Sequence, residues 1–535
     1  MQRIPFFLLL TFAFFTGKAQ VKFSSDFESA SLADYCRIDS VWFKVSEKDS
    51  VLCLSYLITS KSDPINPVDA DLKPSARWFF FRMTGVKDKQ ITLNIKGSDP
   101  LRPVYSYDKV NYHRFDGLAD TCKSHRSDED ARPRYLFTQR FEKDTVYVAY
   151  FIPYDYSYLQ KRIDDWAQHP DVKLDTIGYS RNGLPLQMLV VDDASVPDAR
   201  KKRVWIHGRV HTSETPASWH LDGFIDALIA DTPQAAAYRK AMTFYIVPFA
   251  NPDGVVEGLS RSNAAGVNIE INWNKPEEQT EPEIKALKTI MEKLTAERPF
   301  DMQLNMHSQT SDNATFWVHT ASSTSDYFLK NELKLCYFTL FDKPYLEKED
   351  LAFSNVSERY AEGWAWNKAG DKTLALTFET PYTCYNNNFD LWVTSENLRD
   401  FGATLLTATG DYFGISSPDR IYIGNRNAKT KSGRKKTDYL PGASTSYPDL
   451  LLLDDLLIKA EKKGAKISYT VEKLSAGTYK IYRWIPGPIT NHKDKTVNFW
   501  KPVACYTQKK TGRFKFTLKA AEAGELFDAL LLVRE

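Results

Sequence analysis

The sequence predicts an α/β protein in which a mixed, mostly parallel sheet carries helices on both faces and has a β-sandwich domain on either side. Three observations support this prediction. The chain has 535 residues, more than one ordinary hydrophobic core organises. Its central part alternates apolar strand-like runs with amphipathic helical segments. Both flanking parts instead show short runs of alternating polarity, separated by turn-forming residues.

The composition is that of a globular protein and excludes two kinds of partner. Hydrophobic residues make up 43% of the chain and charged residues 26%. The 70 basic and 68 acidic residues give a formal net charge of +2, which provides no electrostatic basis for binding nucleic acid or an anionic membrane surface. Beyond the N-terminal region, no apolar stretch reaches the ~20 residues that span a bilayer. We therefore expect neither a nucleic-acid partner nor stable membrane insertion.

The N-terminal residues 1–19 have the pattern of a secretory signal peptide. Arg3 precedes an apolar run from Ile4 to Phe15, and Gly17 and Ala19 put small residues at the −3 and −1 positions of a cleavage site. The run is shorter than the ~20 residues of a membrane-spanning helix. We expect cleavage after Ala19 and an exported protein, either periplasmic or extracellular.

Four further segments follow from the change of pattern along the chain. Residues 20–155 are expected to form an N-terminal β-sandwich domain, and residues 156–414 the α/β domain. Residues 415–445 are polar and rich in turn formers, which predicts a linker. Residues 446–535 return to strand-like alternation and are expected to form a C-terminal β-sandwich domain.

The strongest chemical signal is His211-Thr212-Ser213-Glu214, directly after the apolar strand-like run Val204–His207. An imidazole and a carboxylate at this spacing can converge on one metal ion, and zinc accepts both. His307 follows a second such run, Met302–Met306, and supplies a third ligand. Ligands gather in this way because strands of a parallel sheet end at the same edge. Three other histidines remain alternative ligands, although packing explains each of them: His207, His220 and His319.

Two charged residues, each downstream of a predicted strand, complete a hydrolytic set. Glu379 ends the apolar run Leu374–Phe378, where partial burial raises its pKa and a nearby metal lowers it, so that it can act as a base near neutral pH. Arg261 follows the turn Asn251–Gly254 and can present its guanidinium to charge developing on a carbonyl oxygen. The alternatives are a buried ion pair for Glu379 and a surface salt bridge for Arg261.

From about Gly178 to about Phe413, the order and spacing of these elements resemble the carboxypeptidase A family of zinc carboxypeptidases. The resemblance implies the zinc carboxypeptidase fold and one Zn²⁺ ion. It assigns the following roles: His211, Glu214 and His307 as zinc ligands, Glu379 as general base and Arg261 as the carbonyl-polarising arginine. The segment GRVHTSETPASW and the front-domain segment IPYDYSYL resemble the cytosolic carboxypeptidase branch. The expected export excludes a cytosolic role, so the resemblance does not extend to a cytosolic substrate.

One departure from the family concerns the Asn-Arg pair that clamps the terminal carboxylate of the substrate. In an alignment without gaps, Glu270 and Ile271 occupy those two positions after Gly266. An alternative alignment places Asn272 and Trp273 there, but it needs a gap and also lacks the arginine. A guanidinium grips a carboxylate with two hydrogen bonds, whereas a glutamate repels it. Either another arginine substitutes, with Arg209 and Arg359 as candidates, or the substrate lacks a free α-carboxylate. An amine or a sugar hydroxyl would suit Glu270 better.

The family also has a mobile tyrosine, for which Tyr360 is the candidate, and the nearby Trp364 and Trp366 are candidates for the specificity pocket. The function expected from all these features is a secreted zinc-dependent hydrolase that cleaves a peptide or amide bond with metal-activated water. The alternative is a zinc-dependent deacylase or esterase acting on a carbohydrate or another acylated substrate. A binding module without activity is disfavoured because the ligands, the base and the arginine are all present.

Overall fold

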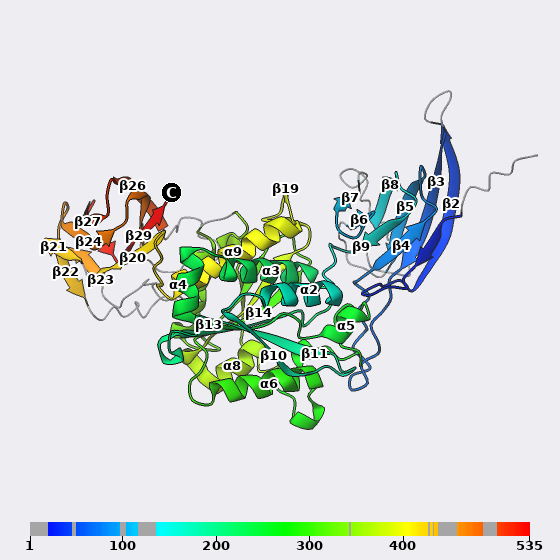
Figure 1. Ribbon diagram of the computed structural model, residues 1–535, viewed down its shortest axis with the longest axis horizontal. Helices are drawn as coiled ribbons and strands as arrows, with labels where there is room; N and C mark the ends of the chain where they lie inside the picture. The colour runs from blue at the N-terminus through cyan, green and yellow to red at the C-terminus, as the bar shows by residue number, and fades with distance from the viewer. Residues whose placement is uncertain are drawn as a thin grey trace, which may run out of the picture.

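A computed structural model describes residues 20–44, 50–96, 103–115, 135–341, 344–425, 428–431, 433–436, 457–484 and 500–535. Figure 1 shows a central α/β unit with β-rich regions at the N-terminal and C-terminal ends of the chain, which confirms the predicted fold class. The expected signal peptide, residues 1–19, lies outside the described residues. No helix within the described ranges is both long enough and apolar enough to cross a bilayer.

The central unit is built on an eight-stranded sheet with the strand order β10-β11-β13-β12-β14-β17-β15-β16. The pairs β12–β13, β12–β14, β14–β17 and β15–β16 are parallel, and the other neighbours are antiparallel. The middle strands β12, β13 and β14 are almost wholly buried, as expected for parallel strands covered on both faces. The strands are β10 (Val172–Tyr179), β11 (Pro185–Val191), β12 (Lys202–Gly208), β13 (Met242–Val247), β14 (Met302–Gln309), β15 (Thr315–His319), β16 (Ala352–Ser354) and β17 (Leu374–Pro381).

Helices cover both faces of this sheet. Figure 1 shows α2, α3, α4 and α9 on one side and α6 and α8 on the other. Helices α3 and α9 pack so closely that a methyl group on Gly402 would lie 1.9 Å from the carbonyl oxygen of His220. The helices are α2 (Tyr156–Trp166), α3 (Thr215–Ile229), α4 (Pro233–Ala241), α5 (Pro252–Val256), α6 (Pro282–Thr295), α7 (Asp326–Thr339), α8 (Ala361–Ala369) and α9 (Ser395–Tyr412).

The N-terminal region forms two sheets, with strand orders β1-β4-β9-β6-β7 and β2-β3-β5-β8. Side chains such as Phe81, Leu93 and Val148 alternate inward from these strands and are fully buried. The strands are β1 (Lys22–Ser24), β2 (Asp34–Lys44), β3 (Ser50–Thr59), β4 (Phe80–Thr84), β5 (Gln90–Lys96), β6 (Val104–Ser106), β7 (Tyr112–Arg114), β8 (Tyr135–Arg140) and β9 (Val146–Ala149).

The C-terminal region forms three small sheets, and part of the segment expected to be a linker belongs to them. Within residues 415–445, β20, β21 and β22 pair with β29, β24 and β23. Trp484 and Trp500 pack on Phe338 of α7, with ring centroids 5.9 and 6.2 Å away. The strands are β20 (Arg420–Gly424), β21 (Lys429–Lys431), β22 (Gly433–Lys436), β23 (Leu457–Ala460), β24 (Lys466–Leu474), β25 (Gly477–Trp484), β26 (Trp500–Gln508), β27 (Gly512–Lys519), β28 (Leu526–Phe527) and β29 (Ala529–Arg534).

The close contact between α3 and α9 predicts that Gly402→Ala destabilises the central unit. Alanine favours a helix over glycine by about 1 kcal/mol, but here its methyl group would collide with the backbone of α3. Thermal unfolding followed by circular dichroism should show a lower midpoint for this variant. Thr407→Ala, on the same helix, is the control and should change the midpoint little. A midpoint for Gly402→Ala at or above that of the parent protein would contradict the packing described.

Candidate functional site

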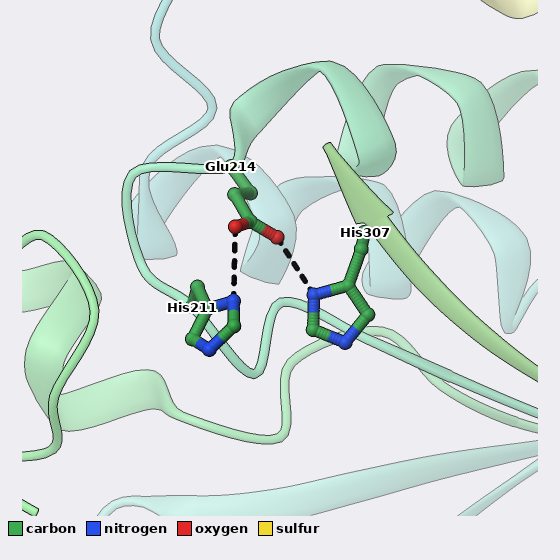
Figure 2. A group of neighbouring side chains, drawn as sticks. All are labelled: His211, Glu214 and His307. Carbon is green, nitrogen blue, oxygen red and sulfur yellow. Dashed lines mark hydrogen bonds and ion pairs between the residues drawn. The ribbon is translucent and has the colours of Figure 1, made fainter. Parts of the chain in front are cut away.

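Two histidines and a glutamate meet at the carboxyl edge of the central sheet (Figure 2). Glu214 precedes the first turn of α3, and its two carboxylate oxygens face the two imidazoles. Its Oε1 lies 2.9 Å from His211 Nδ1, and its Oε2 lies 2.8 Å from His307 Nδ1. All three side chains are buried, and their candidate ligand atoms lie within 4.8 Å of one another. Two imidazole nitrogens and one carboxylate are the donor set of catalytic zinc sites, so these residues fit Zn²⁺.

Strand pairing brings these residues together from distant parts of the chain. Strands β12 and β14 run parallel, with Gly208 opposite Met306, so His307 lies just beyond the last residue of β12. The loop between β12 and α3 then returns His211 to the same place. The backbone of Arg209 is in the left-handed conformation (φ 56°). Its guanidinium donates hydrogen bonds to Thr212 O, Tyr154 O and Ser218 Oγ, which hold the loop. Arg209 is therefore committed to the loop, and it is not part of the wall of the cavity beside the ligands.

The outer nitrogen of each imidazole contacts an oxygen of the 3₁₀ segment around residue 270. His211 Nε2 lies 3.1 Å from Asn268 Oδ1, and His307 Nε2 lies 3.0 Å from Glu270 Oε2. Asn305 Nδ2 donates to the other oxygen of Glu270 at 3.1 Å. The contact with a carboxylate favours a proton on Nε2 of His307 and leaves its Nδ1 free to bind a metal. The sequence offered no signal for Asn268 or Asn305 as members of the site.

Glu379 enters the site from β17, the next strand of the sheet, where it lies opposite His307. Burial raises the pKa of Glu379 to about 7, and the negative charge of Glu214 acts in the same direction. Trp317 Nε1 donates a hydrogen bond to Glu379 Oε1 at 3.0 Å. A carboxyl group with this pKa exchanges protons readily at neutral pH, which is the property required of a general base.

Arg261 lies beside Glu214, in the irregular segment that follows α5. Its Nη1 is 3.6 Å from Glu214 Oε1, and its Nη2 is 3.0 Å from His211 Nε2. About a third of the side chain is exposed, at 35%. Its guanidinium therefore borders the ligand cluster while it remains accessible to a substrate.

One cavity of about 310 Å³ opens onto this centre, and Arg261, His307 and Glu379 are part of its wall. Tyr360 and Glu270, expected at the substrate, line it as well. Among the described residues of this wall, Arg261 is the only arginine or lysine.

Glu362 is a member of the cavity wall that the sequence analysis missed. It is buried, and Thr377 Oγ1 donates a hydrogen bond to its Oε1 at 2.6 Å. Burial raises the pKa of Glu362, and the negative charge of Glu270 adds to the effect. The inner part of the cavity therefore has two acidic groups close enough to influence one another.

Other residues expected at the substrate lie elsewhere. Trp364 packs on Trp273 at 5.6 Å between ring centroids and lines a separate cavity with Phe300. It is turned away because it follows Glu362 by only two positions on α8, and residues at this spacing do not share a helix face. Ile271 is not part of the cavity wall, and the exposed Arg359 is not part of it either. Ile271 follows Glu270 in the sequence and Arg359 precedes Tyr360, but neither side chain lines the cavity.

The three alternative histidines do not join the ligand cluster. His207 is buried and accepts a hydrogen bond from Trp205 Nε1 at 3.1 Å. His220 lies between the rings of Phe378 and Phe401, with centroids 5.0 and 5.1 Å away. His319 contributes to the cavity wall, where its Nδ1 lies 2.6 Å from Glu332 Oε1.

Comparison with known proteins agrees with this geometry. The sequence profile of the zinc carboxypeptidase family matches residues 159–407. Cytosolic carboxypeptidase 2 of Danio rerio is 29% identical over 265 residues, which are 45% of this chain and 37% of that protein. The human protein of the same name is 26% identical over 344 residues, 59% of this chain and 36% of that protein. The chain thus spans a little over a third of the length of these relatives.

Solved structures show the same fold. A metallo-carboxypeptidase from Burkholderia cenocepacia superimposes with a TM-score of 0.59 at 22% identity, covering 74% of this chain and 99% of that one. A carboxypeptidase A-like protein from Shewanella denitrificans gives a TM-score of 0.58 at 23% identity, covering 72% and 97%. Residues 159–407 therefore form a zinc carboxypeptidase domain, homologous to that of the cytosolic carboxypeptidases and with the fold of the bacterial metallocarboxypeptidases.

Proposed function

We propose that this protein is an exported zinc-dependent hydrolase that cleaves a peptide or amide bond in a substrate without a free carboxylate at the cleaved end. The observation that carries the proposal is the shared cavity: both histidines of the ligand cluster, Glu379 and Arg261 border one space large enough for part of a substrate. The export is supported by the pattern of residues 1–19 alone.

The metal ligands, Glu379 and Arg261 each have a separate role in the proposed reaction. A zinc ion bound by His211, Glu214 and His307 supplies a Lewis acid that polarises a carbonyl group and makes water more acidic. Glu379 takes a proton from the attacking water and passes it to the leaving amine, which its pKa of about 7 allows. Arg261 donates hydrogen bonds to the carbonyl oxygen as negative charge develops on it.

The acidic inner wall of the cavity determines what the substrate can present there. A terminal carboxylate would meet Glu270 and Glu362 and would lack an arginine to bind it, since the single guanidinium of the wall lies beside Glu214. Like charges brought next to one another in a binding site weaken binding by several kcal/mol. An ammonium group or an uncharged amide would be favoured instead, so the substrate class is an amidated, cross-linked or amine-bearing peptide.

A second candidate function is the removal of an acyl group from a carbohydrate. The observation in its favour is the outer wall of the cavity, which carries Ser354, Asn355 and Ser357. Hydroxyl and amide groups of this kind both donate and accept hydrogen bonds, as sugar hydroxyls require. The same base and the same arginine would serve an ester or an N-acyl group.

In either reaction, Glu270 acts on the metal through His307. Both of its oxygens are engaged, one with His307 Nε2 and one with Asn305. A carboxylate hydrogen-bonded to a metal-binding histidine orients the ring and raises its basicity. Glu270, at the position of the clamp, would therefore support a metal ligand instead of binding a substrate carboxylate.

Glu270→Gln should weaken zinc binding by about 10- to 100-fold, the usual effect of losing such a partner. The dissociation constant is measured by competition with a chromogenic chelator. The control is Glu278→Gln, an exposed glutamate outside the cavity, which should bind zinc as tightly as the parent protein. Equal zinc affinity in the two variants would show that Glu270 does not support the ligand.

Glu379→Gln should retain zinc but lower kcat by about 10²- to 10⁴-fold, because the amide cannot accept the proton of water. Zinc content is determined by elemental analysis, and turnover is measured on the best substrate of the panel described next. The activity of the parent protein should also disappear on dialysis against a chelator and return with added zinc. Full turnover by Glu379→Gln would remove it as the base.

The substrate panel consists of peptides with free C-termini, the same peptides amidated, and N-acylated amino sugars. The acidic wall predicts a higher kcat/KM for amidated peptides than for their free acids, and Glu362→Gln should reduce that preference. Hydrolysis of the amino sugars alone would favour the deacylase. Preference for the free acids would contradict the substrate class proposed here.

A further inference from the structure

We propose that Asp63, in the N-terminal region, is a positioning residue for Arg261; this inference rests on the role proposed above for Arg261. Asp63 lies between β3 and β4, almost two hundred residues before Arg261. Its carboxylate accepts hydrogen bonds from three consecutive backbone N–H groups: Ser260 to Oδ1 at 2.6 Å, and Arg261 and Ser262 to Oδ2 at 2.8 and 3.0 Å. The side chain of Asp63 is 5% exposed.

The segment held by Asp63 has no regular secondary structure of its own. Residues 257–268 lie between α5 and a short 3₁₀ turn and form neither helix nor strand. The backbone of Arg261 therefore receives no hydrogen bonds from a helix or a sheet ladder. Contacts with other parts of the chain must fix it, since a buried N–H without an acceptor costs about 1–3 kcal/mol.

These contacts come from two sides. The central unit binds carbonyl groups of the segment: Ser213 N donates to Ser260 O at 2.9 Å, and Asn251 Nδ2 donates to Ser262 O at 3.0 Å. Asp63 binds the N–H groups of the same residues. An ionised acceptor forms stronger hydrogen bonds than a neutral one, so the carboxylate is well suited to hold three donors at once. Arg261 is thus held between the two structural units.

Asp63 is itself fixed by its surroundings. Its own N–H donates to Ser75 O at 2.7 Å, which closes the loop that carries it. On either side, the N-terminal backbone lies directly against glycines of the held segment. A methyl group on Gly258 (φ 64°) would lie 2.3 Å from Ala30 O, and one on Gly266 (φ 82°) 2.7 Å from Ile65 O. Figure 1 shows this part of the N-terminal region beside α5, where Ser29 N donates to Val256 O at 3.0 Å.

The N-terminal region therefore contributes to catalysis by holding the backbone of Arg261 in place. Loss of the Asp63 carboxylate would leave three N–H groups without an acceptor, and the segment would shift to find other partners. Arg261 would then be displaced from the position where it meets the carbonyl oxygen. A displacement of about 1 Å at such a group can cost up to 10²-fold in rate. The metal ligands lie on other elements, but Ser213 and Asn268 connect them to this segment, so zinc content is measured beside kcat.

The test is a double-mutant cycle in the full-length, zinc-loaded protein. Asp63→Ala should lower kcat by about 10- to 100-fold, with KM and zinc content close to those of the parent protein. In the Arg261→Ala background, the same substitution should lower kcat no further. Asp63→Asn keeps one acceptor oxygen and should give an intermediate loss, and it replaces Asp63→Ala if that variant fails to fold.

Lys61→Ala is the matched control. Lys61 Nζ donates to Glu257 O at 3.0 Å across the same interface but does not touch residues 260–262, so kcat should be unchanged. An equal loss from Asp63→Ala in both backgrounds would overturn the inference, because the effect would then not pass through Arg261. Normal kcat in Asp63→Ala or in Arg261→Ala would overturn it as well. These outcomes are distinct from failure of the proposed function, which Glu379→Gln decides.

Discussion

The convergence of two imidazole Nδ1 atoms on the carboxylate of Glu214 is the interaction on which the rest of the site depends. It requires β12 and β14 to pair in parallel and to end at the same edge of the sheet, because only then do His211 and His307 meet. The outer nitrogens are held by Asn268 and Glu270, so the rings have little freedom to turn. A buried cluster of this composition is stabilised by the cation that it binds.

The site is not confined to the central unit. Arg261 borders the ligands, yet its backbone is held by a carboxylate from the N-terminal region. The division of the chain near residue 155 thus follows the succession of secondary structure, whereas the hydrogen bonds that hold the segment of Arg261 cross it. Further contacts of the N-terminal region reach α5 and the residues after it: Ser29 N donates to Val256 O, and Trp78 N donates to Ser260 Oγ.

The features that could be predicted from the sequence are those set by the hydrophobic pattern of neighbouring residues. Alternating strands and helices indicated the central sheet, and His307 and Glu379 were recognisable because each ends an apolar strand. The strands between residues 420 and 436 were not predicted, since their polar sequence resembles a loop and their pairing partners lie far along the chain. Glu362 and Asp63 were missed for the same reason: only the folded chain shows what they face.

The most direct test of this account is anomalous diffraction at the zinc absorption edge from crystals of the purified protein. We expect one strong peak, bound by His211 Nδ1, His307 Nδ1 and the carboxylate of Glu214, with the contacts of Asn268 and Glu270 to the outer nitrogens preserved. A peak at other residues, or rings turned so that Nε2 binds the metal, would contradict it.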